Sequence, residues 1–267
     1  MPNKKEFEKS KLIEALDDIS KQLKGPIDAF LVGGLSMIFH GAKLATKDID
    51  IVFSNQKNAQ AFIDAANEIG FSDANNLGNE YIDLKARCVL EGKDQVRFDI
   101  FIDKVCNALR FSQRMKERSQ KMYDRNDLRL YVASIEDIFL FKAITSRPDD
   151  LADMATLAGK EIQWSIVEEE ARSQDESWKW IGRLYGRLEE LEEKYGIPSP
   201  LKGRIREEAE IAQAIDILAG RLQRGPISLK NVAEALKEED YDFVKKVIKE
   251  MKHFKIIEER DGLFYTS

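Results

Sequence analysis

The sequence has few of the residues that build metal or redox sites through sulfur or imidazole. Its two cysteines, Cys88 and Cys106, do not form a CxxC pair, so we expect buried free thiols rather than a zinc or redox centre. Its two histidines, His40 and His253, lie far apart with no second ligand at metal-binding spacing. A histidine-based metal site is therefore not expected.

Long apolar runs and low-complexity tracts are also missing. No apolar run approaches the roughly 18 residues that a membrane span needs, and the polar N-terminus lacks the apolar core of a secretion signal. We therefore expect a cytoplasmic protein that does not contact membranes. A length of 267 residues, with 43% hydrophobic and 34% charged residues, indicates a globular chain of two or three domains. The net charge of −6 argues against a general nucleic-acid coat but leaves room for a local basic groove.

The expected elements change in kind along the chain. The first part mixes the two kinds, with helices over Phe7–Leu23, Leu35–His40 and Lys57–Ile69 and strands over Ala29–Gly34, Asp48–Phe53, Tyr81–Leu90 and Val96–Ile102. After Asp103 the pattern predicts helices almost to the end, with IPSPLKG as the best linker. The prediction is an α+β fold of three domains, over residues 1–133, 134–203 and 204–267.

The C-terminal domain has the pattern of a winged helix-turn-helix. Helices are expected over Leu229–Leu236 and Tyr241–Phe254, followed by a hairpin around Asp261-Gly262. A row of lysines at helical spacing is a candidate for contacts with DNA phosphates: Lys245, Lys249 and Lys252. Because acidic residues outnumber basic ones here, protein contacts or dimerisation are the alternative role of the module.

Three aspartates stand in or beside strands that otherwise read as buried. On a strand, residues i and i+2 point the same way, so Asp48 and Asp50 share one face of the strand DIDIVF. Asp99 lies in a later apolar strand, VRFDIFID, and pairing of the two strands would bring it close to them. Grouped carboxylates are tolerated with divalent cations, and oxygen ligands suit Mg²⁺ or Mn²⁺. We therefore expect a metal site formed by Asp48, Asp50 and Asp99.

Two adjacent glycines precede the first of these strands. Gly33 and Gly34 form a turn that leads into a predicted helix. Such a turn lets backbone N–H groups approach a phosphate closely. Phosphate binding next to the predicted metal site is thus the expected role of the glycines.

Together these motifs resemble those of the DNA polymerase β-like nucleotidyltransferase superfamily. The stretches VGGLSMIFHG…TKDIDIVF and EDIFLFKAITSRPDDLADM resemble its branch of small prokaryotic proteins that includes AbiEii-type toxins, over roughly residues 27–158. The resemblance implies a mixed sheet flanked by helices, and transfer of a nucleoside monophosphate from an NTP. It implies triphosphate contacts for Gly33, Gly34, Ser36 and Lys142, metal binding for Asp48 and Asp50, metal binding and acceptor activation for Asp99, and a second patch at Asp150 or Asp153. One departure is Leu35, which stands where the superfamily usually has the serine that here follows as Ser36.

Several of these residues have a structural interpretation beside the functional one. Lys142 follows three apolar residues and could be a surface lysine with a buried stem. Arg147, Asp150 and Asp153 could form a salt-bridge cluster at the start of a helix. The most basic segment could be a solvated face or a seat for phosphates: Arg114, Lys116, Arg118, Lys121, Arg125 and Arg129.

Three functions from different classes follow from these observations. The first is a Mg²⁺-dependent nucleotidyltransferase acting on a hydroxyl, with tRNA or a protein as candidate acceptors and a toxin or defence role. The second is a DNA-binding regulator that senses a nucleotide without turnover. The third is a structural partner in a protein complex. The sequence leaves the acceptor, the preferred NTP and the oligomeric state open.

Overall fold

The computed structural model describes residues 9–46, 48–74, 86–92, 96–145, 147–238 and 240–267. The chain divides into two compact units, Met1–Glu170 and Ala171–Ser267, each with a hydrophobic core of its own. This division does not test the three predicted domain boundaries, which stay predictions. Among the described residues, no helix is both long and apolar enough to cross a membrane.

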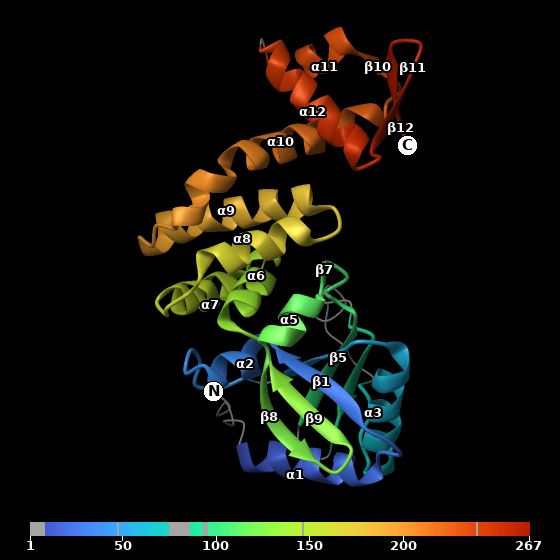
Figure 1. Cartoon of the computed structure of the whole chain (residues 1–267), viewed down its shortest axis with the longest axis vertical. Coiled ribbons are helices and arrows are strands. Elements are labelled where there is room, and N and C mark those ends of the chain that lie inside the picture. Colours follow the sequence, from blue (N-terminus) through green and yellow to red (C-terminus); the bar gives the residue numbers. More distant parts are fainter. Residues whose placement is uncertain (1–8, 47, 75–85, 93–95, 146, 239) are drawn as a thin grey trace. The chain divides into compact units, whose positions relative to one another are not determined.

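A mixed β-sheet forms the centre of the first unit (Figure 1). Its longer strands are β1 (Ile27–Val32), β2 (Ile49–Phe53), β4 (Cys88–Glu91), β5 (Arg97–Ile102), β8 (Gln120–Arg125) and β9 (Leu128–Val132). Its two-residue strands are β3 (Ser72–Asp73), β6 (Lys104–Val105) and β7 (Leu109–Arg110). The order across the sheet is β3-β4-β5-β2-β1-β9-β8, with β6 and β7 extending from the end of β5. Strand β1 is antiparallel to β2 and parallel to β9, while β2 and β5 are parallel, so the sheet is mixed as predicted.

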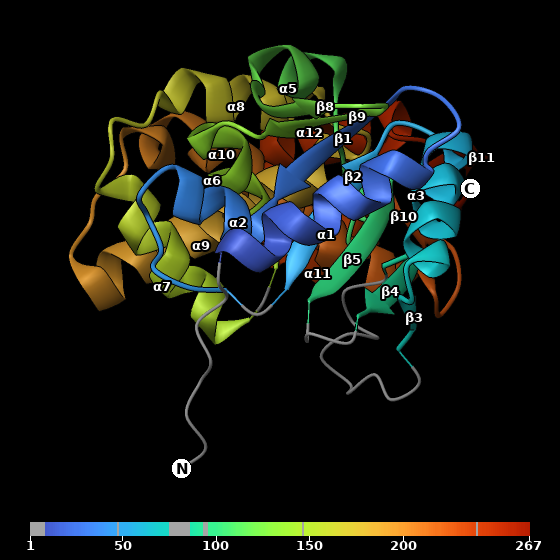
Figure 2. The same ribbon diagram turned by 90° about the horizontal axis from the view of Figure 1, so that it is seen from below.

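One face of this sheet is covered by two helices, α1 (Lys9–Gln22) and α3 (Gln56–Glu68), which lie side by side (Figure 2). Because side chains alternate along a strand, every second residue of each strand faces these helices. In β2 these residues are Ile49, Ile51 and Phe53, which are fully buried in the same core as Leu16 of α1 and Phe62 of α3. The intervening residues of β2, Asp50 among them, therefore point to the other face of the sheet.

Near that other face lie the short helices α2 (Gly33–Phe39) and α5 (Gln113–Arg118), followed by α6 (Ile135–Ile144) and α7 (Pro148–Ala158). Aromatic contacts join the sheet to these helices. Phe30 of β1 packs against Phe111, and Phe111 packs against Phe141 of α6. Helix α6 is buried almost throughout because it is apolar around its circumference. It brings its one lysine, Lys142, into the interior of the unit.

The segment after Asp103 differs from its prediction. It was expected to be helical, but it contains β6, β7, β8 and β9. Strand β9 fits its position by alternation, with Leu128, Leu130 and Val132 buried. It pairs in parallel with β1, a contact between residues about 100 positions apart that no local pattern reveals. The predicted helix is wrong here because the tertiary pairing decides the structure of this short segment.

The second unit consists mainly of helices and ends in a small antiparallel sheet. After α8 (Trp164–Ser173), which crosses the boundary between the units, its elements are α9 (Ser177–Tyr195), α10 (Pro200–Leu222), β10 (Ile227–Ser228), α11 (Leu229–Leu236), α12 (Tyr241–His253), β11 (Ile257–Arg260) and β12 (Leu263–Thr266). Helices α9 and α10 pack against each other, and α10 begins inside the predicted linker IPSPLKG. The three strands have the order β10-β12-β11.

The hairpin between β11 and β12 is the one that the sequence predicts. Arg260 pairs with Leu263, which leaves a two-residue loop. Both loop residues, Asp261 and Gly262, have positive φ angles, as a tight two-residue turn requires. The predicted strand over residues 81–90 is seen in part. Strand β4 pairs with β5 in the antiparallel sense, but residues 75–85 and 93–95 lie outside the described residues.

Candidate functional site

The structure brings the predicted carboxylates to one face of the sheet. Asp50 of β2 and Asp99 of β5 are direct partners in the parallel register. Asp48 lies two residues before Asp50 and so on the same face. Among charged groups, Asp50 and Asp48 have the largest effects on the pKa of Asp99, which places all three carboxylates close together. They lie on the face opposite α1 and α3.

Asp99 is the most buried of the three carboxylates. Its residue is 1% exposed, and burial, followed by the negative charges of Asp50 and Asp48, raises its pKa to about 7. Its Oδ1 accepts a hydrogen bond from Arg97 Nε at 3.3 Å, and Arg97 Nε also lies 3.5 Å from Asp48 Oδ1. The other oxygen, Oδ2, is buried and accepts no hydrogen bond from the described residues. A buried carboxylate oxygen without a donor is costly unless a cation or a proton satisfies it.

Asp50 connects the carboxylates to a second group of charges. Burial raises its pKa, while the positive charges of Lys142 and Arg147 act in the opposite direction. Both cations come from the segment of α6 and α7, which is therefore close to Asp50. The two predicted patches thus form one continuous polar region in the first unit.

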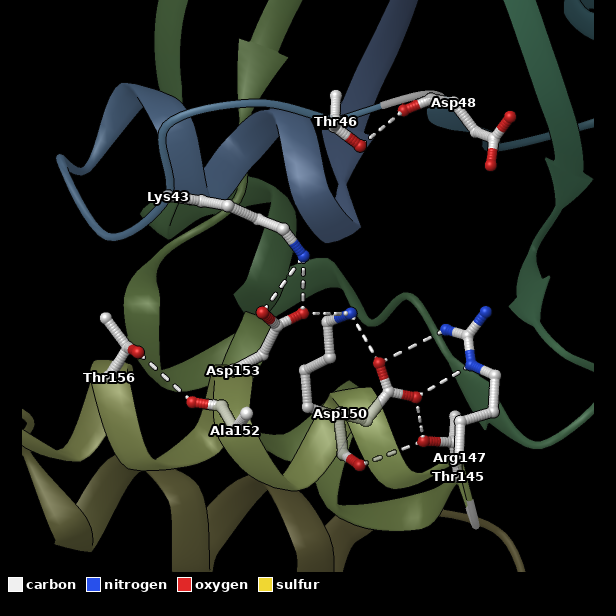
Figure 3. Close-up of polar contacts among 10 residues, drawn as sticks. Lys43, Thr46, Asp48, Thr145, Arg147, Asp150, Ala152, Asp153 and Thr156 are labelled. Atoms are coloured by element: carbon white, nitrogen blue, oxygen red, sulfur yellow. Dashed lines mark hydrogen bonds and ion pairs between the residues drawn. The ribbon is translucent and has the colours of Figure 1, made fainter. Parts of the chain in front are cut away.

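The second patch is a network of ion pairs (Figure 3). Lys142 Nζ donates to Asp150 Oδ1 at 2.6 Å and lies 2.8 Å from Asp153 Oδ2. Arg147 Nε donates to Asp150 Oδ2 at 2.8 Å, and Thr145 donates to the same carboxylate. Although burial acts against it, the neighbouring Lys142 and Arg147 lower the pKa of Asp150. Lys142 is 7% exposed, so it is a buried, paired lysine and not the surface lysine of the structural interpretation.

Lys43 also belongs to this network, and the sequence did not single it out. Its Nζ donates to both oxygens of Asp153 at 2.9 Å, across 110 positions of the chain. Figure 3 shows Lys43 and Arg147 reaching the carboxylates of Asp153 and Asp150 from different sides. Three cations thus face two carboxylates, and the surplus positive charge lies beside Asp50.

Close packing explains why the chain has two glycines at the start of α2. A Cβ on Gly33, whose φ is +66°, would lie 2.0 Å from Asp50 Oδ2. A Cβ on Gly34 would lie 2.5 Å from Oγ1 of Thr46, which donates to the backbone oxygen of Asp48. The glycines therefore leave space for Asp50 and for the loop before Asp48. Their predicted phosphate contacts stay predictions.

Ser36 and His40 occupy structural positions in and after α2. The Ser36 side chain is fully buried, and its hydroxyl has no hydrogen-bond partner among the described residues. The predicted contact between Ser36 and a triphosphate stays a prediction, and it would require a phosphate to reach this buried hydroxyl. His40 Nε2 is hydrogen-bonded to the backbone oxygen of Ala133, which ties the end of α2 to β9.

Most basic residues of the segment around α5 and β8 form ion pairs with acidic residues of the same chain. These ion pairs are Arg114 with Glu170, Arg118 with Asp137 and Glu170, Lys121 with Asp124, Arg125 with Asp17, and Arg129 with Asp28. Charges paired in this way are less available for an external phosphate. The structure therefore favours the structural interpretation of this segment over a phosphate seat.

The donor set at the sheet face suits a hard divalent cation. Asp48, Asp50 and Asp99 offer carboxylate oxygens alone, the ligands that Mg²⁺ and Mn²⁺ prefer, and Asp99 Oδ2 is buried without a donor from the described residues. As the side chains stand, no group of three or more His, Cys, Asp and Glu residues in the described part of the chain is arranged to hold a metal ion. The metal site thus stays a prediction that the chemistry of the ligands supports.

The fold and the site define an α+β protein with a carboxylate pair in register on one face of a mixed sheet. The family described as "Nucleotidyltransferase of unknown function (DUF6036)" matches residues 10–195. This match covers well over half of the chain, so the protein belongs to that nucleotidyltransferase family. A search of curated proteins gave no match.

Among solved structures, the chain is similar to a crystal structure of a "putative nucleotidyltransferase" from Thermotoga maritima. The two sequences are 15% identical, and the match covers 51% of this chain and 84% of the other. The TM-score between the two structures is 0.34. Membership of the family therefore rests on the sequence match alone.

Sequence reasoning missed two charged residues of this region, Arg97 and Lys43. Arg97 stands two positions before Asp99, so the alternation that grouped Asp48 with Asp50 also predicts that Arg97 and Asp99 share a face. That signal was present in the sequence. Lys43, in the loop after α2, carries no comparable signal, because its partner Asp153 lies in α7, far along the chain.

Proposed function

We propose that this protein is a Mg²⁺- or Mn²⁺-dependent nucleotidyltransferase that moves a nucleoside monophosphate from an NTP to a hydroxyl acceptor. The observation that carries the proposal is the in-register pair Asp50 and Asp99, with Asp48 on the same face of the sheet. Family membership supports nucleotidyl transfer in general. The divalent cations, the acceptor and the biological role belong to the proposal.

In the proposed reaction, the acceptor oxygen attacks the α-phosphorus of the NTP and the bond to the bridging oxygen breaks, which releases pyrophosphate. Bound divalent cations would stabilise the negative charge that builds up on these phosphate oxygens. Asp48, Asp50 and Asp99 would hold them. Asp99, whose pKa is raised to about 7 in the metal-free protein, would also accept the proton of the acceptor hydroxyl.

The cations beside Asp50 have a complementary role in the proposal. Lys142 and Arg147 lie close enough to influence the ionisation of Asp50, and Asp150 and Asp153 hold them in place. A triphosphate that approaches the carboxylates would therefore meet fixed positive charge. Gly33 and Gly34 would allow the backbone of α2 to come close to the phosphates.

The proposal is tested by transfer of label from α-labelled NTPs into RNA or protein. Asp48→Asn and Asp50→Asn each keep the shape of the side chain and remove its charge, so both should abolish transfer. Neither should lower the melting temperature, because they relieve repulsion between carboxylates. Asp124→Asn, on β8 of the same sheet and paired at the surface with Lys121, is the matched control and should transfer normally. Transfer at the wild-type rate by both site variants would refute the proposed enzyme.

We further propose that the C-terminal elements form a winged helix-turn-helix, with α11 and α12 as the helix pair and β11–β12 as the wing. On α12, Lys245 lies 3.0 Å from Asp242 and Lys252 lies 2.6 Å from Glu259, while Lys249 is exposed. Two of the three predicted DNA contacts are thus paired within the module. This pairing favours the enzyme over the alternative, a nucleotide-sensing DNA-binding regulator without turnover.

Gel shifts with the DNA upstream of the protein's own coding sequence separate these two functions. If the protein is the DNA-binding regulator, the wild type shifts this DNA and a triple alanine variant of Lys245, Lys249 and Lys252 does not. No pyrophosphate is then released from NTPs. If the protein is the nucleotidyltransferase, pyrophosphate is released from NTPs whether or not the C-terminal module binds DNA. Alanine at Lys230, Lys237 and Lys255 of the same unit gives a control of equal charge loss.

The proposed setting is the cytoplasm, where NTPs and Mg²⁺ are available, and the proposed role is that of a toxin or defence component of the AbiEii-type branch. tRNA or a protein is the proposed acceptor. Mass spectrometry of total cellular RNA and protein, after incubation with the purified chain, NTPs and Mg²⁺, would reveal an added nucleotide mass. The same incubation with Asp50→Asn is the control.

A further inference from the structure

Arg97 lies between two carboxylates of the proposed site, those of Asp48 and Asp99. On β2 and β5 the register pairs Ile49 with Phe98 and Asp50 with Asp99. Extending it by one residue places Asp48 opposite Arg97, in agreement with the 3.5 Å between Arg97 Nε and Asp48 Oδ1. Three acidic side chains and one basic side chain therefore form a four-membered group on one face of the sheet.

The contacts of Arg97 with these carboxylates are loose. Its Nε lies 3.3 Å from Asp99 Oδ1 and 3.5 Å from Asp48 Oδ1, whereas charge-assisted hydrogen bonds are typically about 2.7–2.9 Å long. One nitrogen is thus shared between two carboxylates at long distance. Meanwhile Asp99 Oδ2 is buried and accepts no hydrogen bond from the described residues. The arrangement balances charge in part but leaves Asp99 with an unsatisfied oxygen.

A divalent cation held by Asp48 and Asp99 would compete with Arg97 for these two carboxylates, whose Oδ1 atoms Arg97 contacts. The positive guanidinium and the cation would also repel each other in a region of low dielectric constant. Both effects oppose metal binding. A cation would need additional oxygen ligands, such as those of a triphosphate, to overcome the competition.

We propose that Arg97 is an internal competitor of the divalent cation: it offsets part of the negative charge of Asp48 and Asp99 in the metal-free protein and keeps the affinity for the metal alone low. The metal is then bound firmly only together with the phosphates of the NTP. This inference rests on the proposed function, because it assumes that the carboxylates bind a divalent cation. It assigns Arg97 a positioning role and not a catalytic one.

The test is a titration of the purified full-length chain with Mn²⁺ alone, in which electron paramagnetic resonance measures the free ion. Arg97→Met removes the charge and keeps most of the apolar stem, and it should tighten Mn²⁺ binding at least tenfold, equivalent to about 1.4 kcal/mol. Arg97→Lys keeps the charge and should bind Mn²⁺ about as weakly as the wild type. Arg110→Met is the matched control, since Arg110 is an exposed arginine that pairs with Asp103.

A second readout separates competition from an ordinary structural role. In EDTA, Arg97→Met should melt at a lower temperature than the wild type, because the carboxylates lose their counter-ion. With Mn²⁺ it should gain more in melting temperature than the wild type does. An arginine with a merely structural role would lower the melting temperature without increasing this gain, so equal gains would contradict the competition.

The outcomes distinguish this inference from the proposed function. If Asp50→Asn abolishes Mn²⁺ binding but Arg97→Met binds Mn²⁺ no more tightly than the wild type, the competition is refuted and the metal site stands. If wild type and Arg97→Met both bind no more Mn²⁺ than Asp50→Asn does, the metal site itself is refuted, and the inference with it. Tighter binding in Arg97→Met alone, with Arg97→Lys and Arg110→Met unchanged, supports the inference.

Discussion

Two carboxylates that lie side by side on neighbouring strands, as Asp50 and Asp99 do, are harder to ionise than carboxylates in water. For Asp99, burial and the charges of Asp50 and Asp48 raise the pKa to about 7, and burial raises the pKa of Asp50 as well. Each ionised group costs free energy that a proton or a cation can offset. The stability of the metal-free protein should therefore depend on pH through these residues.

The sign of this dependence follows from proton linkage. In the unfolded chain Asp99 loses its proton near pH 4, whereas in the folded protein it keeps the proton up to about pH 7. Between these values the folded state binds more protons, so the free energy of unfolding should fall as the pH rises, by at most about 1.4 kcal/mol per pH unit for this residue. Urea denaturation in EDTA at pH 5, 6, 7 and 8 measures this slope, and Asp99→Asn should reduce it. A slope in Asp99→Asn equal to that of the wild type would contradict the assignment to Asp99.

At Gly33, both the backbone conformation and the packing against Asp50 exclude a side chain. Its φ of +66° disfavours any side chain, and a Cβ would lie 2.0 Å from Asp50 Oδ2. Gly33→Ala should therefore destabilise the first unit by about 3 kcal/mol, from the left-handed conformation and the clash together. It should also displace Asp50 and weaken Mn²⁺ binding. Hydrogen exchange of the first unit measures the loss of stability.

Gly196 is a matched control for this substitution. It ends α9 with nearly the same conformation, at φ +65°, but a Cβ there would meet nothing within 4 Å. Gly196→Ala should therefore cost the second unit about 1 kcal/mol, from the backbone conformation alone. Equal losses for the two substitutions would show that the contact between Gly33 and Asp50 is unimportant.

Among the elements, α5, α6 and α8 are held together by a buried group of charges. Arg118 of α5 lies 2.5 Å from Asp137 of α6 and 2.8 Å from Glu170 of α8. The two acids are almost fully buried, and Asp137 also accepts a hydrogen bond from Ser134, the residue before α6. Such a group orients the helices because neither acid can remain ionised in the interior at low cost without its cation.

Removing this cation should be far more costly than removing an exposed one. Arg118→Met leaves Asp137 without its guanidinium and leaves Glu170 with Arg114, whose Nε lies 3.6 Å from Glu170 Oε2, and it should lower the free energy of unfolding by about 3 kcal/mol. Arg129→Met is the control, since Arg129 pairs with Asp28 at the surface, and it should cost less than about 1 kcal/mol. Urea denaturation compares the two variants. Adding Asp137→Asn to Arg118→Met should recover part of the loss, and a further loss instead would contradict the charge argument.

Among the described residues, each unit has a hydrophobic core that shares no residue with that of the other unit. Phe98 belongs to the core under the sheet, where it packs against Phe62 and Phe71. Ile215 of α10 belongs to the core formed with α11, α12 and the small sheet. Both side chains are fully buried. Because each of these cores lies within one unit, damage to one core should remain largely within its unit.

Substitutions in the two cores test this independence. Phe98→Ala should destabilise the first unit by about 4 kcal/mol and Ile215→Ala the second by about 3 kcal/mol, because each leaves a cavity. Hydrogen exchange followed by mass spectrometry assigns the loss of protection to residues 9–170 or 171–267. Mn²⁺ binding should weaken in Phe98→Ala, which adjoins Asp99, and stay unchanged in Ile215→Ala. A loss of protection across both units in either variant would show that they unfold together.

Local patterns in the sequence were enough to predict the general fold class and several elements. Alternation in DIDIVF predicted that Asp48 and Asp50 share a face, and Asp261-Gly262 predicted the last hairpin, because both depend on neighbouring residues alone. The apolar character of VRFDIFID likewise predicted the strand that carries Asp99. The motifs also pointed to the nucleotidyltransferase superfamily, which the family match supports.

Contacts between segments distant in the sequence decided the strand pairing and the side-chain contacts of the site. The pairing of β9 with β1 turned an expected helical segment into strands, and the bond from Lys43 to Asp153 joined residues 110 positions apart. The register that sets Asp50 beside Asp99, and Arg97 beside both Asp48 and Asp99, likewise depends on two strands that are not consecutive in the chain. Periodicity tells which way a side chain points, but only the packed structure tells what it meets, because the free energy of such contacts arises from burial that segments share after folding.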